Sequence, residues 1–305
     1  AIEIVAELFR DLEAKRLLRG DGVGSGQEIL PRRLGGNRLL DQRHQRRLQR
    51  IEHAAKLLQR HAGLVEADDG MVRVVDVADC LGNLPLDREH PPFLEVSTPE
   101  GLLSAAQMNV IEFHTWNATS NAIGKPDRMV FDLDPGEGVE WSFMQQGAEL
   151  VRIFLNELGL VSFLKTSGGK GLHIVVPIKR LRDWDTVKDF SQAIVEHLAK
   201  AIPPRFVAKS GPSNRVGRIF IDYLRNGLGA TTASAWSARA RPGLGASVPL
   251  AWEELEMLPG GDRWTASNIH DRLGIGNIPW ADYEASRRSI VPAMKILGFK
   301  PGNKA

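Results

Sequence analysis

The order of its helices and strands predicts that the chain has an α+β fold. Between residues 129 and 224, apolar strand-like runs and amphipathic helices follow one another in the order β-α-β-β-α-β. This order is the split βαβ unit of ferredoxin-like folds, in which the first and last strands are neighbours and the third lies on the other side of the first. The 305 residues are 43% hydrophobic and 25% charged, a composition typical of soluble globular proteins.

Each element of this unit has its own signal in the sequence. The strands are expected at residues 129–134, 161–167, 172–178 and 216–224, and the helices at residues 140–158 and 184–201. The strands are short runs rich in apolar residues, and a glycine turn at residues 168–171 separates the second strand from the third. In the helices apolar residues recur every three or four positions, as Val151, Phe154 and Leu158 do in the first helix.

Two further segments precede this unit. A helix is expected to start at Thr98, with Pro99 in its first position, and a strand follows at residues 109–116. Residues 31–61 carry nine Lys or Arg and only two acidic residues, and residues 41–61 within them can form a basic amphipathic helix. Such a helix is either a solvated surface helix or a contact for the phosphates of nucleic acid.

Composition excludes several classes of protein. No stretch approaches the ~18 consecutive apolar residues that a membrane helix needs, and the first residues lack the basic start and apolar run of a signal peptide. Cys80 is the only cysteine, which excludes an internal disulfide and a cysteine-rich zinc site. We therefore expect a protein of the reducing cytoplasm; association with the nucleoid is expected only if the chain acts on DNA.

Two acidic residues end the first predicted strand, in the run MVFDLDPGEG. Asp132 and Asp134 are two residues apart, so they point to the same face of the strand and repel each other unless a cation lies between them. The predicted strand order brings Asp222 beside them and His173 to their other side. Asp134 could instead simply begin the turn before Pro135. We expect a metal site, because the third acid lies on the neighbouring strand.

Three carboxylates form an oxygen-rich site of the kind that Mg²⁺ or Mn²⁺ prefers in proteins. Acids on two adjacent strands can bridge two divalent cations, the arrangement used for in-line nucleotidyl transfer. One cation would lower the pKa of a primer 3′-hydroxyl, and the other would neutralise charge on the triphosphate and the leaving pyrophosphate. The predicted catalytic and metal-binding residues are Asp132, Asp134 and Asp222.

A glycine-rich hairpin, KTSGGKGLHIVVP, contains the second group of candidate residues. Its turn consists of Ser167, Gly168, Gly169, Lys170 and Gly171. Free backbone N–H groups, a hydroxyl and an ammonium make this turn a candidate anion nest, although its spacing is not that of a Walker A loop. His173 is either a satisfied core histidine or a contact for a triphosphate. Arg225 and Arg239 follow further along the chain, and guanidinium groups suit phosphate because they donate two parallel hydrogen bonds.

Together, the runs FHTWN, RMVFDLDPGEG, KTSGGKGLHIVVP, RIFIDYLRN and SARARPG resemble the polymerase domain of bacterial DNA ligase D, a member of the archaeo-eukaryotic primase superfamily. The resemblance implies a primase-like palm that adds ribo- or deoxyribonucleotides to DNA 3′ ends during non-homologous end joining. It implies two divalent cations, Mn²⁺ or Mg²⁺, and a nucleoside triphosphate as substrate. The implied partners are DNA ends, the Ku protein, and the ligase and phosphoesterase domains of the same polypeptide.

The resemblance also assigns roles to individual residues. Asp132, Asp134 and Asp222 match the metal-binding acids of the family. The triphosphate contacts match Ser167 and His173, with Gly168, Gly169 and Lys170 in the same loop; His114 matches a histidine near the sugar, and Arg225 and Arg239 match arginines around the incoming nucleotide.

The resemblance divides the chain into three parts. Residues 85–285 are expected to form the catalytic domain. Residues 286–305 are expected to be a tail or linker, because they are basic and contain Gly and Pro near their end. Residues 1–84 form an atypical N-terminal region, because the LLPHLRGRP and FFQKH runs usual in the family are missing. We interpret this region either as a different N-terminal segment or as the product of an altered reading frame, and we assign no residue to base stacking or 5′-phosphate binding.

Two alternative functions remain open on the sequence. A strand ending in D-x-D also occurs in phosphatases of the haloacid-dehalogenase type, where the first Asp is a nucleophile. Pro135 and the lack of a later paired-acid motif speak against this alternative. The chain could also be a catalytically weak module that binds DNA ends, and salt-sensitive DNA binding without nucleotide incorporation would indicate that function.

Overall fold

The computed structural model describes residues 82–84, 93–96, 101–102, 105–106 and 110–302. These residues belong to two compact units, and the second begins at Ile111. In the first unit, strand β1 (Gly82–Leu84) pairs antiparallel with β2 (Phe93–Glu95). The predicted basic helix at residues 41–61 and all but the last three residues of the expected N-terminal region lie outside the described residues.

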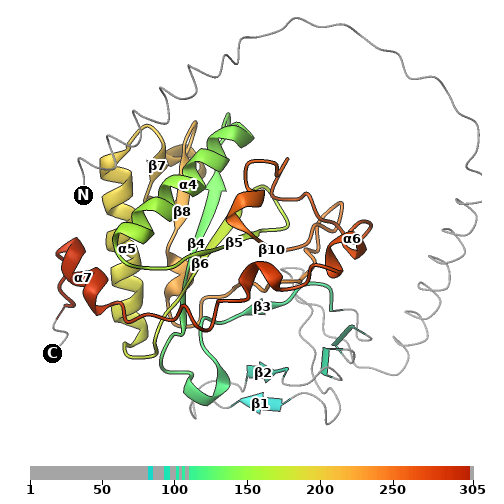
Figure 1. The fold of residues 1–305 in the computed structure, drawn as a ribbon, viewed down its shortest axis with the longest axis horizontal. Helices are drawn as coiled ribbons and strands as arrows, with labels where there is room; N and C mark the ends of the chain where they lie inside the picture. The colour runs from blue at the N-terminus through green and yellow to red at the C-terminus, as the bar shows by residue number, and fades with distance from the viewer. Residues whose placement is uncertain (1–81, 85–92, 97–100, 103–104, 107–109, 303–305) are drawn as a thin grey trace, which may run out of the picture. The chain divides into compact units, whose positions relative to one another are not determined.

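A six-stranded sheet forms the centre of the second unit, with strand order β10-β5-β6-β4-β8-β7 (Figure 1). Its strands are β4 (Arg128–Pro135), β5 (Phe163–Thr166), β6 (Leu172–Pro177), β7 (Phe206–Val207), β8 (Ile219–Asp222) and β10 (Pro249–Leu250). Strand β4 lies between β6 and β8 and is antiparallel to both. The predicted β-α-β-β-α-β order and the predicted neighbours of the first strand are therefore confirmed.

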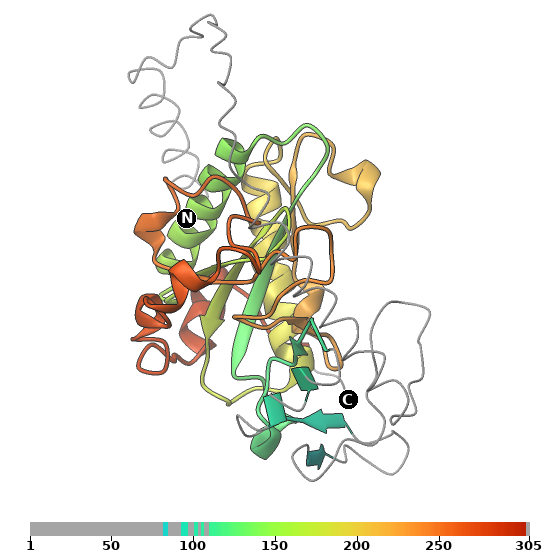
Figure 2. The same cartoon turned by 90° about the vertical axis from the view of Figure 1, so that its right-hand side faces the viewer.

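Two long helices, α4 (Trp141–Glu157) and α5 (Trp184–Ala201), complete the unit at or near the predicted positions (Figures 1 and 2). The carboxylate of Asp183 caps α5 by accepting a hydrogen bond of 2.8 Å from the backbone N–H of Thr186. The last predicted strand is shorter than expected, because the chain turns into a 3-10 helix directly after Tyr223.

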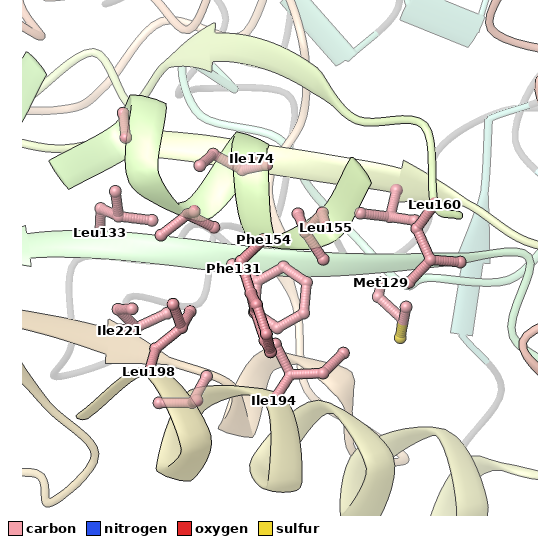
Figure 3. Packing of buried hydrophobic residues seen from close by; sticks show 14 of the residues in the cluster. Met129, Phe131, Leu133, Phe154, Leu155, Leu160, Ile174, Ile194, Leu198 and Ile221 are labelled. Atoms are coloured by element: carbon pink, nitrogen blue, oxygen red, sulfur yellow. The ribbon is translucent and has the colours of Figure 1, made fainter. Parts of the chain in front are cut away.

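The hydrophobic core lies between the sheet and the two helices (Figure 3). Alternate residues of β4, namely Met129, Phe131 and Leu133, are fully buried and point into it. They pack with residues of both helices, among them Phe154 of α4 and Ile194 of α5, so both helices cover the same face. The period of two along β4 leaves the residues in between on the opposite face.

The remaining elements are short. Strand β3 (His114–Thr115) pairs antiparallel with β9 (Thr232–Ala233), so within residues 110–116, the described part of the strand predicted at residues 109–116, only these two residues form a strand. The other short elements are η1 (Ser120–Ala122), η2 (Pro212–Asn214), η3 (Leu224–Asn226), η4 (Trp252–Glu254), α6 (His270–Leu273), η5 (Ile278–Trp280) and α7 (Val291–Leu297). Of the helix predicted from Thr98 onward, residues 101–102 and 105–106 are helical and the rest lies outside the described residues.

The C-terminal segment differs from the expected tail or linker. Ile290, Ala293 and Met294 are buried and belong to the same core as the sheet and the two long helices. The ring of Phe299 lies 5.5 Å from that of Phe190 in α5, which fixes α7 beside that helix (Figure 1). Its Gly- and Pro-containing sequence suggested a linker, but its apolar residues complete the core.

Within the described part of the chain, no helix combines the length and the hydrophobicity that a membrane crossing requires.

Candidate functional site

A row of four ionisable side chains crosses the sheet on the face opposite the helices. Asp132 of β4 lies opposite His173 of β6 on one side and opposite Asp222 of β8 on the other. His173 in turn lies opposite Lys165 of β5. Because directly opposed residues of antiparallel strands point to the same face, these four residues form one line, which we call the polar row. The register thus brings Asp132, Asp222 and His173 together as the predicted strand order required.

Asp132 lies between His173 and Asp222 in the row. Its Oδ1 lies 3.2 Å from His173 Nε2, and its Oδ2 lies 3.9 Å from Arg225 Nε. Burial raises the pKa of Asp132, but the hydrogen bond and charge of His173, together with Arg225 and Lys165, outweigh burial and hold the pKa below its ordinary value. Asp132 is therefore an ionised carboxylate at neutral pH.

The other two acids are held as ionised groups less easily. Burial and the charges of Asp132 and Asp222 raise the pKa of Asp134 to about 6, although Arg215 Nη1 lies 3.3 Å from its Oδ2. Burial and the charge of Asp132 also raise the pKa of Asp222, against the opposing effect of Arg225 Nε at 3.1 Å and the backbone N–H of Leu224. Repulsion between the carboxylates is thus only partly compensated by arginine.

A cavity of about 1050 Å³ opens beside the acids. Among the predicted site residues, its lining contains Asp132, Asp134, Ser167, Gly169, Lys170, His173, Arg225 and Arg239. Gly168, His114 and Asp222 do not line it, although Asp222 lies next to Asp132 in the row. The acidic strand end, the glycine turn and both predicted arginines therefore meet around one space.

The glycine turn uses much of its own hydrogen-bonding capacity. Ser167 Oγ accepts from the backbone N–H groups of Gly169 (3.1 Å) and Gly171 (3.2 Å). The N–H of Gly168, a residue with a φ of +70°, donates to the carbonyl of Gly261 at 3.1 Å. The expectation of free backbone N–H groups is therefore wrong for these three glycines. The hydroxyl hydrogen of Ser167 and the ammonium of Lys170 remain the donors that face the cavity.

Glu112 connects two predicted site residues, His114 and Arg239. Its carboxylate lies 2.5 Å from His114 Nε2 and accepts from Arg239 Nε at 2.6 Å and from the backbone N–H of Ala240 at 2.8 Å. Burial raises the pKa of Glu112, but the combined effect of these three partners is larger and opposite, so the pKa lies below its ordinary value. Arg239 also donates to the carbonyl of Ser167 at 2.8 Å, which joins this network to the glycine turn.

Sequence reasoning did not find Glu112, Lys165 and Arg215. Lys165 lies two residues before Ser167 in the run KTSGGKGLHIVVP. This spacing was the one sequence signal that Lys165 points to the same face of the strand as Ser167. Glu112 stands two residues before His114 in the strand predicted at residues 109–116, so the period of two was an available signal for it. Arg215 comes from an irregular segment, where no periodicity indicates which way a side chain points.

The acids fit a divalent cation by their chemistry but are not preassembled around one. Burial, together with repulsion between the carboxylates, raises two of the three pKa values, so a hard cation would stabilise this donor set. Yet in the described residues no three His, Cys, Asp or Glu side chains converge as ligands on one point. Arg215 and Arg225 occupy the oxygens that a cation would need. The Nε of Arg225, at 3.1 Å from Asp222 Oδ2, is buried and forms an ion pair there without hydrogen-bond geometry.

Comparison with known proteins decides the family. The family model for the primase-polymerase domain of LigD matches residues 46–280. The chain belongs to this family. Its fold is accordingly the primase-like α+β fold that the resemblance implied, and the similarity to a solved LigD polymerase domain supports the same conclusion.

Individual LigD proteins show how far the similarity extends. The multifunctional non-homologous end joining protein LigD of Pseudomonas aeruginosa is 51% identical over 212 residues, which are 69% of this chain and 25% of that protein. The corresponding protein of Mycolicibacterium smegmatis is 33% identical over 52% of this chain and 21% of its own length. The chain thus spans about a quarter of the curated LigD proteins that it matches.

A solved structure gives the same picture for the fold. The polymerase domain from Mycobacterium tuberculosis ligase D, in complex with DNA, aligns with a TM-score of 0.58 at 26% identity. The alignment covers 64% of this chain and 71% of that one.

Proposed function

We propose that this LigD polymerase domain is a nucleotidyltransferase that adds ribo- or deoxyribonucleotides to DNA 3′ ends in non-homologous end joining. One observation carries the proposal: Asp132, Asp134 and Asp222 meet at the end of two paired strands, beside a cavity lined by Ser167 and Lys170. Family membership supports a polymerase, and the curated relatives are named as end-joining proteins.

The cavity offers one set of groups to the phosphate chain of a nucleoside triphosphate and another to the divalent cations. The cations of Lys170 and Arg225 and the hydroxyl of Ser167 line the space where an anionic phosphate chain would lie. Two divalent cations, Mn²⁺ or Mg²⁺, held by the three acids would activate the primer 3′-hydroxyl and neutralise the leaving pyrophosphate. Asp132, which keeps its charge at neutral pH, is the acid on which that site depends most.

Primer extension tests this function. The protein is incubated with a primer–template bearing a recessed or overhanging 3′ end, Mn²⁺, and either ribo- or deoxyribonucleoside triphosphates. We expect extension, and we expect Asp132→Ala to reduce it at least about 100-fold because an ionised contact to the reacting centre is lost. Glu157→Ala, at the exposed end of α4, is the matched control and should extend normally.

Two other results would contradict this function and favour an alternative one. Absence of extension together with tight, salt-sensitive DNA binding would indicate the end-binding module instead. A phospho-aspartate trapped at Asp132 would indicate the phosphatase, which the family match does not favour.

We further infer that the domain acts within a larger LigD polypeptide, alongside its ligase and phosphoesterase domains, and with Ku at the DNA end. The chain spans only about a quarter of the relatives that are named multifunctional. Co-purification of this domain with Ku on a DNA end, compared with either component alone, measures that association.

A further inference from the structure

Lys165 occupies the end of the polar row and has no assigned role. Only 4% of the residue is exposed, and its ammonium is buried with it. Lysine is rarely buried unless each of its donors has a partner. The Nζ of Lys165 lies 2.7 Å from His173 Nδ1, 2.8 Å from the carbonyl oxygen of Ala233 and 2.7 Å from Ser247 Oγ.

When Lys165 is protonated, hydrogen-bond accounting gives the direction of each contact. The carbonyl oxygen of Ala233 can only accept. The hydroxyl of Ser247 donates its hydrogen to the carbonyl oxygen of Thr166 at 2.8 Å, so its oxygen accepts from Lys165. An ammonium has three N–H donors, and the third is directed at Nδ1 of His173. The pocket around Lys165 therefore has three acceptors for three donors.

The same accounting continues on the other side of His173. An imidazole whose Nδ1 accepts carries its hydrogen on Nε2 when it is neutral. That Nε2 lies 3.2 Å from the ionised carboxylate of Asp132, which can only accept. Because Nδ1 accepts a hydrogen bond from Lys165, it carries no hydrogen of its own, so the ring has a single hydrogen, on Nε2. Lys165 and Asp132 thus favour the same tautomer from opposite sides.

Lys165 also holds a second segment of the site. Ala233, whose carbonyl accepts from Lys165, belongs to β9 and lies opposite His114 in β3. One buried ammonium therefore connects the strand that carries His173 with the strand pair that carries His114. A hydrophobic residue of similar length would fill the space but would leave three acceptors unpaired.

We propose that Lys165 is a positioning residue that fixes the Nε2–H tautomer of His173 and directs that N–H towards Asp132 and the cavity. The inference deepens the proposed function: His173 is then a neutral hydrogen-bond donor for an anionic ligand such as a triphosphate, and its Nε2 is not available as a general base. This consequence rests on the proposed function, whereas the tautomer itself does not.

Nitrogen NMR of the ring tests the tautomer without nucleotide or cation. The protein is labelled with ¹⁵N-histidine, and its spectrum is recorded well below the Lys165 pKa, which burial lowers to about 7, so that Lys165 is an ammonium. The His173 signals are assigned by their loss in His173→Gln. We expect an unprotonated Nδ1 and a protonated Nε2. A protonated Nδ1 in the wild-type protein would overturn the proposal, whether or not any variant folds.

Lys165→Met then removes the three donors and keeps the side-chain length. We expect the His173 ring to lose its single tautomer and the KM for nucleotide to rise about 10-fold, the effect of losing one well-placed hydrogen bond of about 1.4 kcal/mol. Lys179→Met, an exposed lysine just after β6, is the control and should change neither.

Lys165→Gln keeps one amide donor and should restore part of the tautomer preference. A folded Lys165→Met protein with an unchanged His173 spectrum and an unchanged KM would refute the positioning role. If the wild-type protein shows the expected tautomer but extends no primer, the proposed function fails and the assignment of the tautomer stands.

Discussion

Among single residues, Asp134 shows most clearly how the charges of the site lower the stability of the folded protein. Its pKa is raised to about 6 by burial, by Asp132 and by Asp222, so the folded state binds a proton more readily than the unfolded chain. Between the ordinary value of 3.8 and about 6, the stability contribution of Asp134 therefore falls as pH rises. Above pH 6 the folded protein holds a charge that its neighbours disfavour.

Replacing that charge should stabilise the protein above this pH. We expect Asp134→Asn to raise the free energy of unfolding at a pH above 6 and to change it little near pH 4. The gain should stay below about 1 kcal/mol, because 42% of the Asp134 side chain is exposed and solvent screens the repulsion. Urea denaturation across this pH range measures it, with the exposed Asp271→Asn as control. A gain that is the same on both sides of pH 6 would contradict this explanation.

On the scale of one element, the glycine turn packs closely against β4 at one of its glycines. A Cβ on Gly171 would lie 2.3 Å from the carbonyl oxygen of Leu133, in the strand that carries the acids. A Cβ on Gly169 would meet only side-chain atoms at ordinary contact distance, the nearest at 3.5 Å. The two glycines are therefore not equivalent, although the sequence presents them alike.

We expect Gly171→Ala to cost about 1–3 kcal/mol of stability, because the turn or β4 must move to admit the methyl group. Gly169→Ala should cost less than about 1 kcal/mol. Chemical denaturation of the two variants side by side checks the difference. Equal losses would show that the close approach to β4 is not what requires glycine at residue 171.

At this scale the sequence predicted the elements well where periodicity was strong. Helix α5 has the expected bounds because its apolar residues recur regularly and Asp183 caps it. Asp132, Asp134 and Asp222 were found together because the strand order alone determines their neighbours. The role of Lys165 needed the register between β5 and β6, which the sequence does not specify. Glu112 lies in irregular backbone where a strand was predicted, and no pattern in the sequence predicts its contact with Arg239.

For the whole molecule, the C-terminal segment is part of the domain. Arg287 donates to the carbonyl of Asp127 at 2.8 Å, and Arg288 forms a bridge with Ile178 next to β6. Beyond these contacts, Met294 of α7 is only 3% exposed. The expectation of a linker failed because hydrophobic burial, rather than Gly and Pro content, determines whether such a segment packs.

We expect Met294→Ala to lower the free energy of unfolding by about 2–5 kcal/mol, as large-to-small changes in a core do. Lys295→Ala, at the next and exposed position of the same helix, should change it by no more than about 0.5 kcal/mol. Thermal or urea unfolding measures both. If the two variants unfold alike, α7 does not contribute to the cooperative core.

The two faces of β4 leave its eight residues no tolerance for insertion or deletion. Its core residues and its acids alternate one by one along the strand. Adding or removing one residue before Asp132 would exchange the faces, sending carboxylates among phenylalanines and apolar groups into the cavity. Length variation among natural homologues should therefore avoid this strand and collect in the connections on either side of it.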